Sequence, residues 1–330
     1  MAGPAGSPSH TAAGPRIGLC LPYEGSASAE DIVAVARAAE ASGLDSVWVG
    51  DHIAFPVEFT SQNPTMADGR YPYPTDNPRL EALTTLAFVA GATSIIKLAV
   101  NACVLPQRNP VITAKAVATL DHLSGGRVVF GVTLGWLREE FHALGADFDR
   151  RRPLLEDGIE IMRTIWEHDQ PSYDGETYSF EPLHMRPKPV QSPVPIYVGG
   201  HSRPAMRRAA RMGDGWLAAR MTPDDLGTHV AFLRQERAQS PRADQPFTVA
   251  VNCPAAVGPA PPGVLDVADP DATQATLAEL ANAGADVVNI IVVSQDPTET
   301  LTAAQTLSPH CPHPSSLSDP PDNQPAQSPP

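Results

Sequence analysis

Short runs rich in Val and Ile alternate along the chain with longer segments whose apolar residues recur every three or four positions. Uninterrupted apolar runs are typical of parallel strands buried on both faces, and the longer spacing is typical of helices packed against them. The pattern therefore predicts repeated βα units. Eight strands are expected, at 17–22, 46–50, 98–105, 128–135, 195–199, 215–218, 247–252 and 287–293.

The helices between these strands carry their own start and stop signals. Ser28 and Asp31 form an S-x-x-D start, and Gly43 ends the same segment. Similar helices are expected at 109–123 and 152–168. Eight such units predict one α/β domain, a (β/α)8 TIM barrel spanning 16–307. A proline-rich segment at 170–193 breaks the pattern, and we expect it to be an insertion between strands four and five that shapes or covers the site.

The two ends of the chain differ in composition from this body. Residues 1–15 are small and polar, without the apolar core of a signal peptide, so a cytoplasmic protein is expected. Residues 308–330 are rich in proline and poor in apolar side chains, a composition that cannot repay the entropy of ordering. Both the arm 1–15 and the tail 308–330 are therefore expected to be disordered.

Composition also excludes several classes of protein. The formal net charge of −14 argues against nucleic acid as a partner. No apolar run approaches the roughly 18 residues that a membrane span needs, so no membrane partner is expected. The four cysteines form neither a C-x-x-C pair nor a disulfide framework. We expect reduced thiols and no metal site, with a small molecule as the partner.

Candidate chemistry is sought at the carboxyl ends of the strands, where a barrel of this type builds its active site. Asp51 and His52 follow the second strand. Histidine suits proton transfer near neutral pH, and an adjacent carboxylate could set its tautomer. A solvated loop or a helix cap would produce the same pair, so the two residues alone do not decide.

Gly199, Gly200 and His201 close the fifth strand and open a helix. Glycines let backbone N–H groups approach an anion, and a helix N-terminus adds a positive dipole end, so this turn is either a phosphate cradle or an ordinary βα turn. The stretch 182–213 holds six basic residues and no acidic one, which predicts a cationic wall or a surface that uses Arg throughout. The Arg150–Arg152 cluster is interpreted as a solvated helix start.

The fourth strand ends in Gly131-Val-Thr133-Leu-Gly135-Trp136. Small residues at this spacing suit a flat ring packed against the backbone, but barrels also use glycine to make room for neighbouring side chains.

Three segments of the chain are more specific than these single sites: ARAAEASGLDSVWVGDH, NPVITAKAVATLDHLSGGRVVFGVTLGW and PIYVGGHSRPAMRRAARMGDGWL. Together they resemble the bacterial luciferase-like family, and specifically its F420-dependent oxidoreductases. The resemblance extends over nearly all of 16–307. It implies a (β/α)8 barrel that holds a flavin or deazaflavin ring in its mouth, in agreement with the strand count.

The resemblance also assigns roles. Asp51 and His52 correspond to the family's ring-contacting and proton-handling pair, and Cys103-Val104 to a non-prolyl cis peptide that supports the ring. Gly199, Gly200 and His201 correspond to phosphate contacts. Thr133 and Gly135 would lie near the ring or its ribityl chain.

Three activities fit these implications. The leading one is hydride transfer between coenzyme F420 and a C=C, C=N or C=O bond of a small organic substrate, with His52 supplying or removing the proton. The main alternative is FMN-dependent monooxygenation with O2 and reduced flavin. The third is cofactor binding without turnover. The resemblance allows a homodimer and implies a separate flavin or F420 reductase.

Overall fold

A computed structural model describes residues 14–64, 66, 68–71, 73–294 and 296–311. Eight parallel strands pair in chain order, and pairings of β1 with β11 and of β8 with β9 close them into a barrel. The predicted fold and all eight predicted strands are confirmed. The strands are β1 (Arg16–Cys20), β2 (Ser46–Val49), β3 (Lys97–Val104), β4 (Val128–Thr133), β7 (Ile196–Gly199), β8 (Gly215–Ala218), β9 (Thr248–Ala256) and β11 (Val287–Val292).

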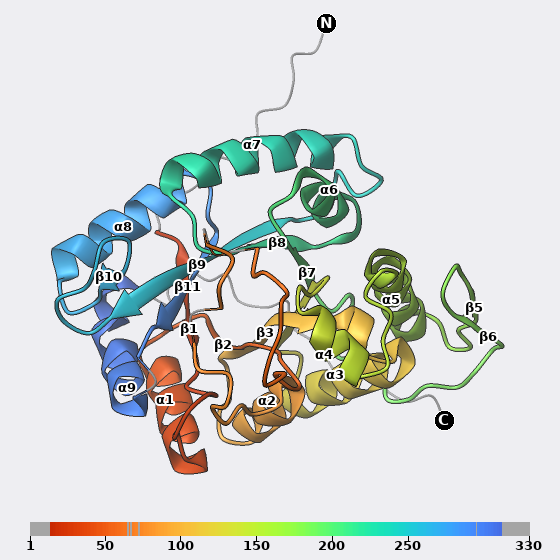
Figure 1. Cartoon of the computed structure of the whole chain (residues 1–330), viewed down its shortest axis with the longest axis horizontal. Coiled ribbons are helices and arrows are strands. Elements are labelled where there is room, and N and C mark those ends of the chain that lie inside the picture. Colours follow the sequence, from red (N-terminus) through yellow and green to blue (C-terminus); the bar gives the residue numbers. More distant parts are fainter. Residues whose placement is uncertain (1–13, 65, 67, 72, 295, 312–330) are drawn as a thin grey trace, which may run out of the picture.

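Helices form an outer ring around these strands (Figure 1). The ring consists of α1 (Ala29–Ala41), α2 (Ala82–Ala90), α3 (Pro110–Ser124), α5 (Arg151–Glu167), α6 (Arg203–Met212), α7 (Pro223–Ala238), α8 (Pro270–Asn282) and α9 (Pro297–Thr306). Shorter elements are α4 (Arg138–Ala143), the 3-10 turns η1 (Leu105–Gln107) and η2 (Ser308–His310), β10 (Leu265–Asp266) beside β9, and the hairpin of β5 (Tyr173–Asp174) and β6 (Ser179–Phe180).

The predicted helix boundaries rest on local hydrogen bonds. The Ser28 hydroxyl accepts from the Asp31 N–H at 3.1 Å, and the Asp31 carboxylate accepts from the Ser28 N–H at 2.8 Å, which completes a capping box. At the other end of α1, Gly43 has a φ of +78°, a conformation that favours glycine. Gly125 ends α3 in the same left-handed region.

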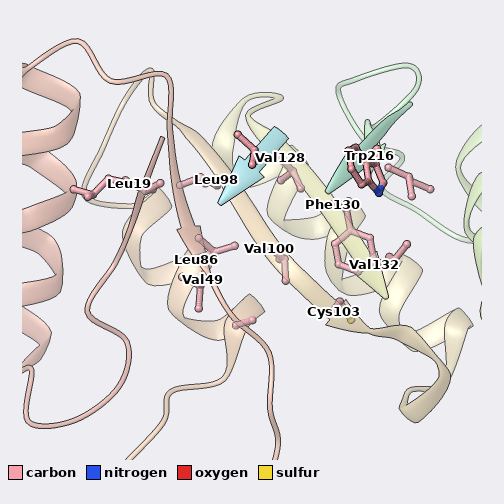
Figure 2. Close-up of a cluster of buried hydrophobic side chains, with 14 of the residues drawn as sticks. Leu19, Val49, Leu86, Leu98, Val100, Cys103, Val128, Phe130, Val132 and Trp216 are labelled. Atoms are coloured by element: carbon pink, nitrogen blue, oxygen red, sulfur yellow. The ribbon is translucent and has the colours of Figure 1, made fainter. Parts of the chain in front are cut away.

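Two apolar layers hold the barrel together. The larger lies between strands and helices, where Leu86 of α2 packs with Leu98 and Val100 of β3 (Figure 2). The smaller lies inside the barrel, where Trp48, Tyr197 and Leu217 pack from three different strands. This inner layer fills the lower part of the barrel, so that any cavity must lie above it, toward the carboxyl ends of the strands.

One irregularity in β3 changes which side chains face inward. From Val100 to Cys103 the chain advances three residues along β3, whereas its pairing partner advances only two residues along β4, from Phe130 to Val132. This bulge reverses the alternation, so Cys103 joins Val100 in the outer layer (Figure 2). The non-prolyl cis peptide is Asn101-Ala102, and the assignment of that bond to Cys103-Val104 was therefore wrong.

The segment 170–193 does not cover the carboxyl ends of the strands. Its hairpin packs on the outside of α5, where the Tyr173 hydroxyl donates to Asp157 at 3.0 Å and the Thr177 N–H donates at 2.6 Å (Figure 1). Farther on, the side-chain amide of Gln191 donates to the carbonyl of Val128, at the start of β4. The expectation that this segment shapes or covers the site was wrong, because the hairpin follows the outer side of α5 and no residue of 170–193 lines the cavity at the carboxyl ends of the strands.

The described chain continues past Leu307, where the folded body was expected to end. Ser308–His310 form η2, and the half-buried Cys311 packs against the apolar layer. The rest of the predicted disordered tail, and nearly all of the predicted arm 1–15, lie outside the described residues.

Candidate functional site

A cavity of about 920 Å³ opens at the carboxyl ends of the strands. This volume lies in the usual range for sites that bind cofactors or drug-sized molecules. The cavity brings together all the residues proposed from the sequence except Cys103. Those that line it are Asp51, His52, Val104, Thr133, Gly135, Gly199, Gly200 and His201.

His52 is held by a carboxylate that sequence reasoning missed. Its Nδ1 lies 3.0 Å from Glu140 Oε2 on α4. Glu140 is buried, and its other oxygen accepts from the N–H groups of Ile53 at 2.8 Å and Ala54 at 3.1 Å. Burial alone would raise the pKa of Glu140, but the hydrogen bond from His52 and those from Ala54 and Gln107 outweigh it and hold this pKa below its ordinary value.

An ionised Glu140 fixes the tautomer of the imidazole. Because the carboxylate only accepts hydrogen bonds, Nδ1 of His52 carries the proton and donates to it. Nε2 is then the ring atom that can accept a proton, or donate one when the ring is charged. The pair is thus arranged for general acid or base chemistry at a single atom.

Asp51 has a different role from the one its neighbour suggests. Its carboxylate accepts from the Val104 N–H at 3.0 Å and pairs with the Arg108 guanidinium at 2.7 Å. Arg108 also pairs with Glu81 at 3.0 Å. Asp51 therefore fixes the end of β3 and does not orient His52, which corrects the interpretation that the adjacent carboxylate sets the tautomer.

Aromatic rings surround His52. The Phe55 ring lies 4.4 Å from the imidazole, and those of Trp136 and Tyr71 lie 6.1 and 6.2 Å away. The Arg79 guanidinium stacks over Phe55 at 4.3 Å. These rings come mainly from the loop between β2 and α2, so this loop, rather than 170–193, covers the site.

Glu139 ties this loop to α4. The N–H of Thr60 donates to it at 2.8 Å and the hydroxyl of Ser61 at 2.6 Å. Burial opposes ionisation, but the hydrogen bond from Ser61 and those from Thr60 lower the pKa of Glu139 to about 2. Two adjacent carboxylates of α4 thus perform separate tasks, one holding the loop and one holding His52.

The opposite end of the cavity is formed by the turn between β7 and α6. Gly200 has a φ of +122°, and Ser202 caps α6 by accepting from the Ala205 N–H at 3.3 Å. Nε2 of His201 accepts from the Ala219 N–H at 2.8 Å, so the proton of the neutral ring lies on Nδ1. Burial, and then the nearby His229, lower the pKa of His201. His201 is therefore a neutral donor.

Two guanidinium groups face this turn across the cavity. Arg138 and Arg151 both line it and both stack on Phe148, at 4.2 and 3.8 Å. Arg138 makes two bonds to Asp149, of 2.9 and 2.7 Å. Burial, and then the charge of Arg138, lower the pKa of Arg151. Arg138 thus has several carboxylates beside it, whereas Arg151 forms an ion pair with none in the described part of the chain, so an anionic group in the cavity would balance its charge.

The predicted cationic wall at 182–213 does not line the cavity. Arg207 pairs with Glu236 at 3.1 Å, Arg208 with Glu156 at 2.9 Å, and Arg203 stacks over Phe232. The sequence placed six like charges together, but the fold supplies acidic and aromatic partners from other helices. The interpretation of Arg150–Arg152 as a solvated helix start was also wrong for Arg151, which lines the cavity.

Thr133 and Gly135 line the cavity at the end of β4, together with Val104 of β3. Gly135 has a φ of +77°, and a Cβ there would meet a Val104 methyl carbon at 2.5 Å and the Phe141 ring at 2.7 Å. The packing of the protein itself therefore requires glycine at this position. None of the helices in the described part of the chain is long and apolar enough to span a membrane.

Comparison with known proteins points to one family. A family model described as luciferase-like monooxygenase matches residues 8–297. An uncharacterized protein of Mycobacterium tuberculosis is 35% identical over 222 residues, which cover 66% of this chain and 78% of that protein. An FMNH(2)-dependent dimethylsulfone monooxygenase of Pseudomonas putida is 32% identical over 222 residues, covering 64% of this chain and 60% of the enzyme.

The fold is also similar to that of solved structures. The coenzyme F420 dependent tetrahydromethanopterin reductase of Methanopyrus kandleri superposes with a TM-score of 0.69 at 17% identity. The match covers 91% of this chain and 99% of that protein.

Proposed function

Because the chain belongs to the luciferase-like monooxygenase family, we propose that it is an oxidoreductase that transfers a hydride between coenzyme F420 and a small organic substrate. The deazaflavin, when bound, supplies or accepts the hydride at its ring. The observation that carries the proposal is the His52–Glu140 pair, which places one proton-transferring atom at the mouth of a cavity of cofactor size.

The donor set of the cavity fits a phosphate-bearing cofactor. Ser202 and the N-terminus of α6, His201 Nδ1–H, and the guanidinium of Arg151 are donors of the kind that phosphate requires. The flatter, less polar part between the end of β4 and the end of β3, with Thr133, Gly135 and Val104, would hold the ring.

The protein's own contribution to the reaction is proton transfer and the exclusion of water. A C=C, C=N or C=O bond that gains a hydride also needs a proton, and His52 Nε2 would supply it; in the reverse direction the same atom would remove it. Ionised Glu140 stabilises the imidazolium in either case. The Phe55, Tyr71 and Trp136 rings keep bulk water from the imidazole.

A second candidate is FMN-dependent monooxygenation, and it is favoured by the 32% identity to the Pseudomonas monooxygenase. For this activity FMN, when bound in its reduced form, would supply the electrons for reaction with O2, and His52 would again transfer the proton. Monooxygenation, and hydride transfer in the direction of substrate reduction, would both depend on a separate reductase that renews the reduced cofactor. Loss of the expected cationic wall removes one argument for the longer, more anionic F420.

Separate titrations of the full-length apo-protein with F420 and with FMN test the proposal, followed by single-turnover oxidation of the reduced cofactor against enones, imines and quinones. Tighter binding of F420 and oxidation without O2 support hydride transfer. Tighter binding of FMN with O2-dependent product supports monooxygenation. Tight binding of a cofactor without turnover on any substrate would favour the third activity, a protein that binds the cofactor without catalysing a reaction.

A further inference from the structure

A second, smaller cavity of about 220 Å³ adjoins the first on the side of β1 and β11. We call it the side recess. The two cavities share one boundary, formed by Tyr23, Glu24, Gly50, Tyr71, Asn101 and Asn252. Beyond it, the recess is lined by the ends of β1 and β11, including Cys20 and Ile291. None of the cofactor-binding residues proposed above lines the recess, which makes it a separate compartment that opens onto the cofactor cavity.

The floor of this boundary is a set of amide side chains inside the barrel. Asn252 Oδ1 accepts from Asn101 Nδ2 at 2.7 Å and from Asn289 Nδ2 at 3.0 Å. Both acceptor positions of that oxygen are therefore used, and the Asn252 amide group keeps its N–H donors. In the described part of the chain, neither these donors nor Asn101 Oδ1 has a protein partner. The Asn252 amide N–H groups and the Asn101 carbonyl oxygen are thus available to a ligand at the junction of the two cavities.

The walls of the recess carry almost no charge. Among the described residues that line it, Glu24 is the charged one, and it pairs with Arg79 at 3.1 Å. Burial raises the pKa of Cys20 to about 12, and burial followed by the charge of Glu24 raises that of Tyr71 to about 12. Both groups stay neutral. Arg220, whose charge acts on Tyr73, is exposed and does not line the recess.

We infer that the side recess holds the substrate, and that this substrate is an uncharged organic molecule whose carbonyl, amide or hydroxyl group pairs with Asn252 and Asn101. The inference rests on the proposed function, because it needs the main cavity to hold the cofactor. An anion placed here would lose its hydration without gaining a cation, beside a carboxylate whose charge Arg79 already balances. A neutral carbonyl would instead exchange water for the Asn252 donors.

Three probes of the same shape test the charge requirement: benzamide, benzoate and benzamidine, each with alkyl homologues of graded length. Binding to the full-length protein is measured by ligand-observed NMR, first without cofactor and then with F420 or FMN bound. We expect an amide to bind at least about tenfold more tightly than its carboxylate and amidine partners. Equal or tighter binding of the carboxylate or the amidine, or binding of no amide in the series, would overturn the inference.

Variants locate the binding site. Ile291 lines the recess and not the main cavity, so Ile291→Trp should abolish amide binding while leaving cofactor binding unchanged. The matched control is Ile95→Trp, at a residue that is 77% exposed and precedes β3 at the opposite end of the barrel. Should Ile291→Trp fail to fold, Ile291→Ala serves instead, and it should shift the preferred amide to a longer homologue. Amide binding that neither change affects contradicts the assignment.

The substitution Asn252→Asp tests whether the Asn252 amide donates to the ligand. It keeps an acceptor for Asn101 and Asn289 but removes the free N–H donors. Amide affinity should fall by about five- to tenfold, and amidine affinity should rise. Cofactor titrations of the same variants separate the two proposals. If F420 or FMN displaces the amide from the native protein, the recess belongs to the cofactor and the inference fails. If neither cofactor binds while the amide still requires Ile291, the proposed function fails and the neutral recess stands.

Discussion

The two ends of the main cavity differ in how their charges are balanced. At the His52 end each charged group has its partner inside the protein: Glu140 faces His52, and Arg108 lies between Asp51 and Glu81. At the α6 end the groups are donors: His201 is neutral, and Arg151 across the cavity forms an ion pair with no carboxylate in the described part of the chain. The first end thus suits proton transfer, whereas the second offers positive charge and N–H groups with which a bound anion would pair.

If this division is right, changes at the two ends should separate chemistry from affinity. His52→Ala removes the proton-transferring atom, so turnover should fall about 10²- to 10⁴-fold while cofactor affinity stays within a few fold. Single-turnover oxidation of the reduced cofactor and a cofactor titration measure the two quantities. A variant that retains native turnover on a good substrate would remove His52 from the mechanism.

Removal of the carboxylate behind His52 should have the next largest effect. Glu140→Gln keeps the shape but gives up the charge that stabilises the imidazolium, and turnover should fall about 10- to 100-fold with a shifted pH profile. Gln107→Leu is the control, because it removes a different donor to the same carboxylate. A pH profile identical to that of the native enzyme would show that Glu140 is only structural.

The same variant tests the pH dependence of stability. The pKa of Glu140 is lowered in the folded protein from its ordinary value of 4.5, so its stabilising effect is present above pH 4.5 and is lost as the pH falls through the folded value. Acid unfolding of the native protein should therefore be steeper below pH 4.5 than that of Glu140→Gln. Chemical denaturation at a series of pH values between 3 and 6, a range chosen to bracket that ordinary value, measures this slope.

The sequence predicted the strands and missed the partner of His52 for physical reasons. Buried parallel strands such as β4 are apolar throughout, and a local pattern is enough to detect them. Glu140 lies 88 residues from His52 along the chain, and in the sequence it resembles one of two acidic residues on a short exposed helix. Its burial arises only when the loop after β2 folds back over α4, which no local pattern encodes.

Charge clusters failed as predictors for a related reason. Arg207 and Arg208 are neighbours in sequence but pair with carboxylates on two different helices, α7 and α5. Arg151, in a cluster interpreted as solvated, enters the cavity because its helix begins at the rim. The irregularity in β3 was equally hidden, since one extra residue turns Cys103 outward and brings Val104 to the cavity side without changing the apolar pattern.

At the proposed phosphate site, Arg151→Met should weaken binding of the cofactor about tenfold and leave the single-turnover rate at saturation nearly unchanged. The loss should shrink at high salt, because it reports an interaction between charges. Arg207→Met is the matched control, and its pairing with Glu236 away from the cavity predicts unchanged affinity for both F420 and FMN. Equal losses of cofactor affinity in the two variants would mean that the basic residues of 182–213 contribute to cofactor binding after all.

The smallest effect is expected at the end of the chain, far from both ends of the cavity. Truncation after Cys311 should leave the melting temperature and cofactor affinity unchanged, since 312–330 has too few apolar residues to form a core. Truncation after Leu307 also removes Cys311, whose Cβ lies 3.7 Å from the position a Cβ would take at Gly43. Loss of that half-buried contact should cost about 1 kcal/mol and lower the melting temperature by a few degrees, with affinity still native. Calorimetry of the two truncated proteins measures the contribution of the chain end to packing, and a cofactor titration of each measures its contribution to the site. A change in cofactor affinity in either protein would show that the chain end reaches the cavity.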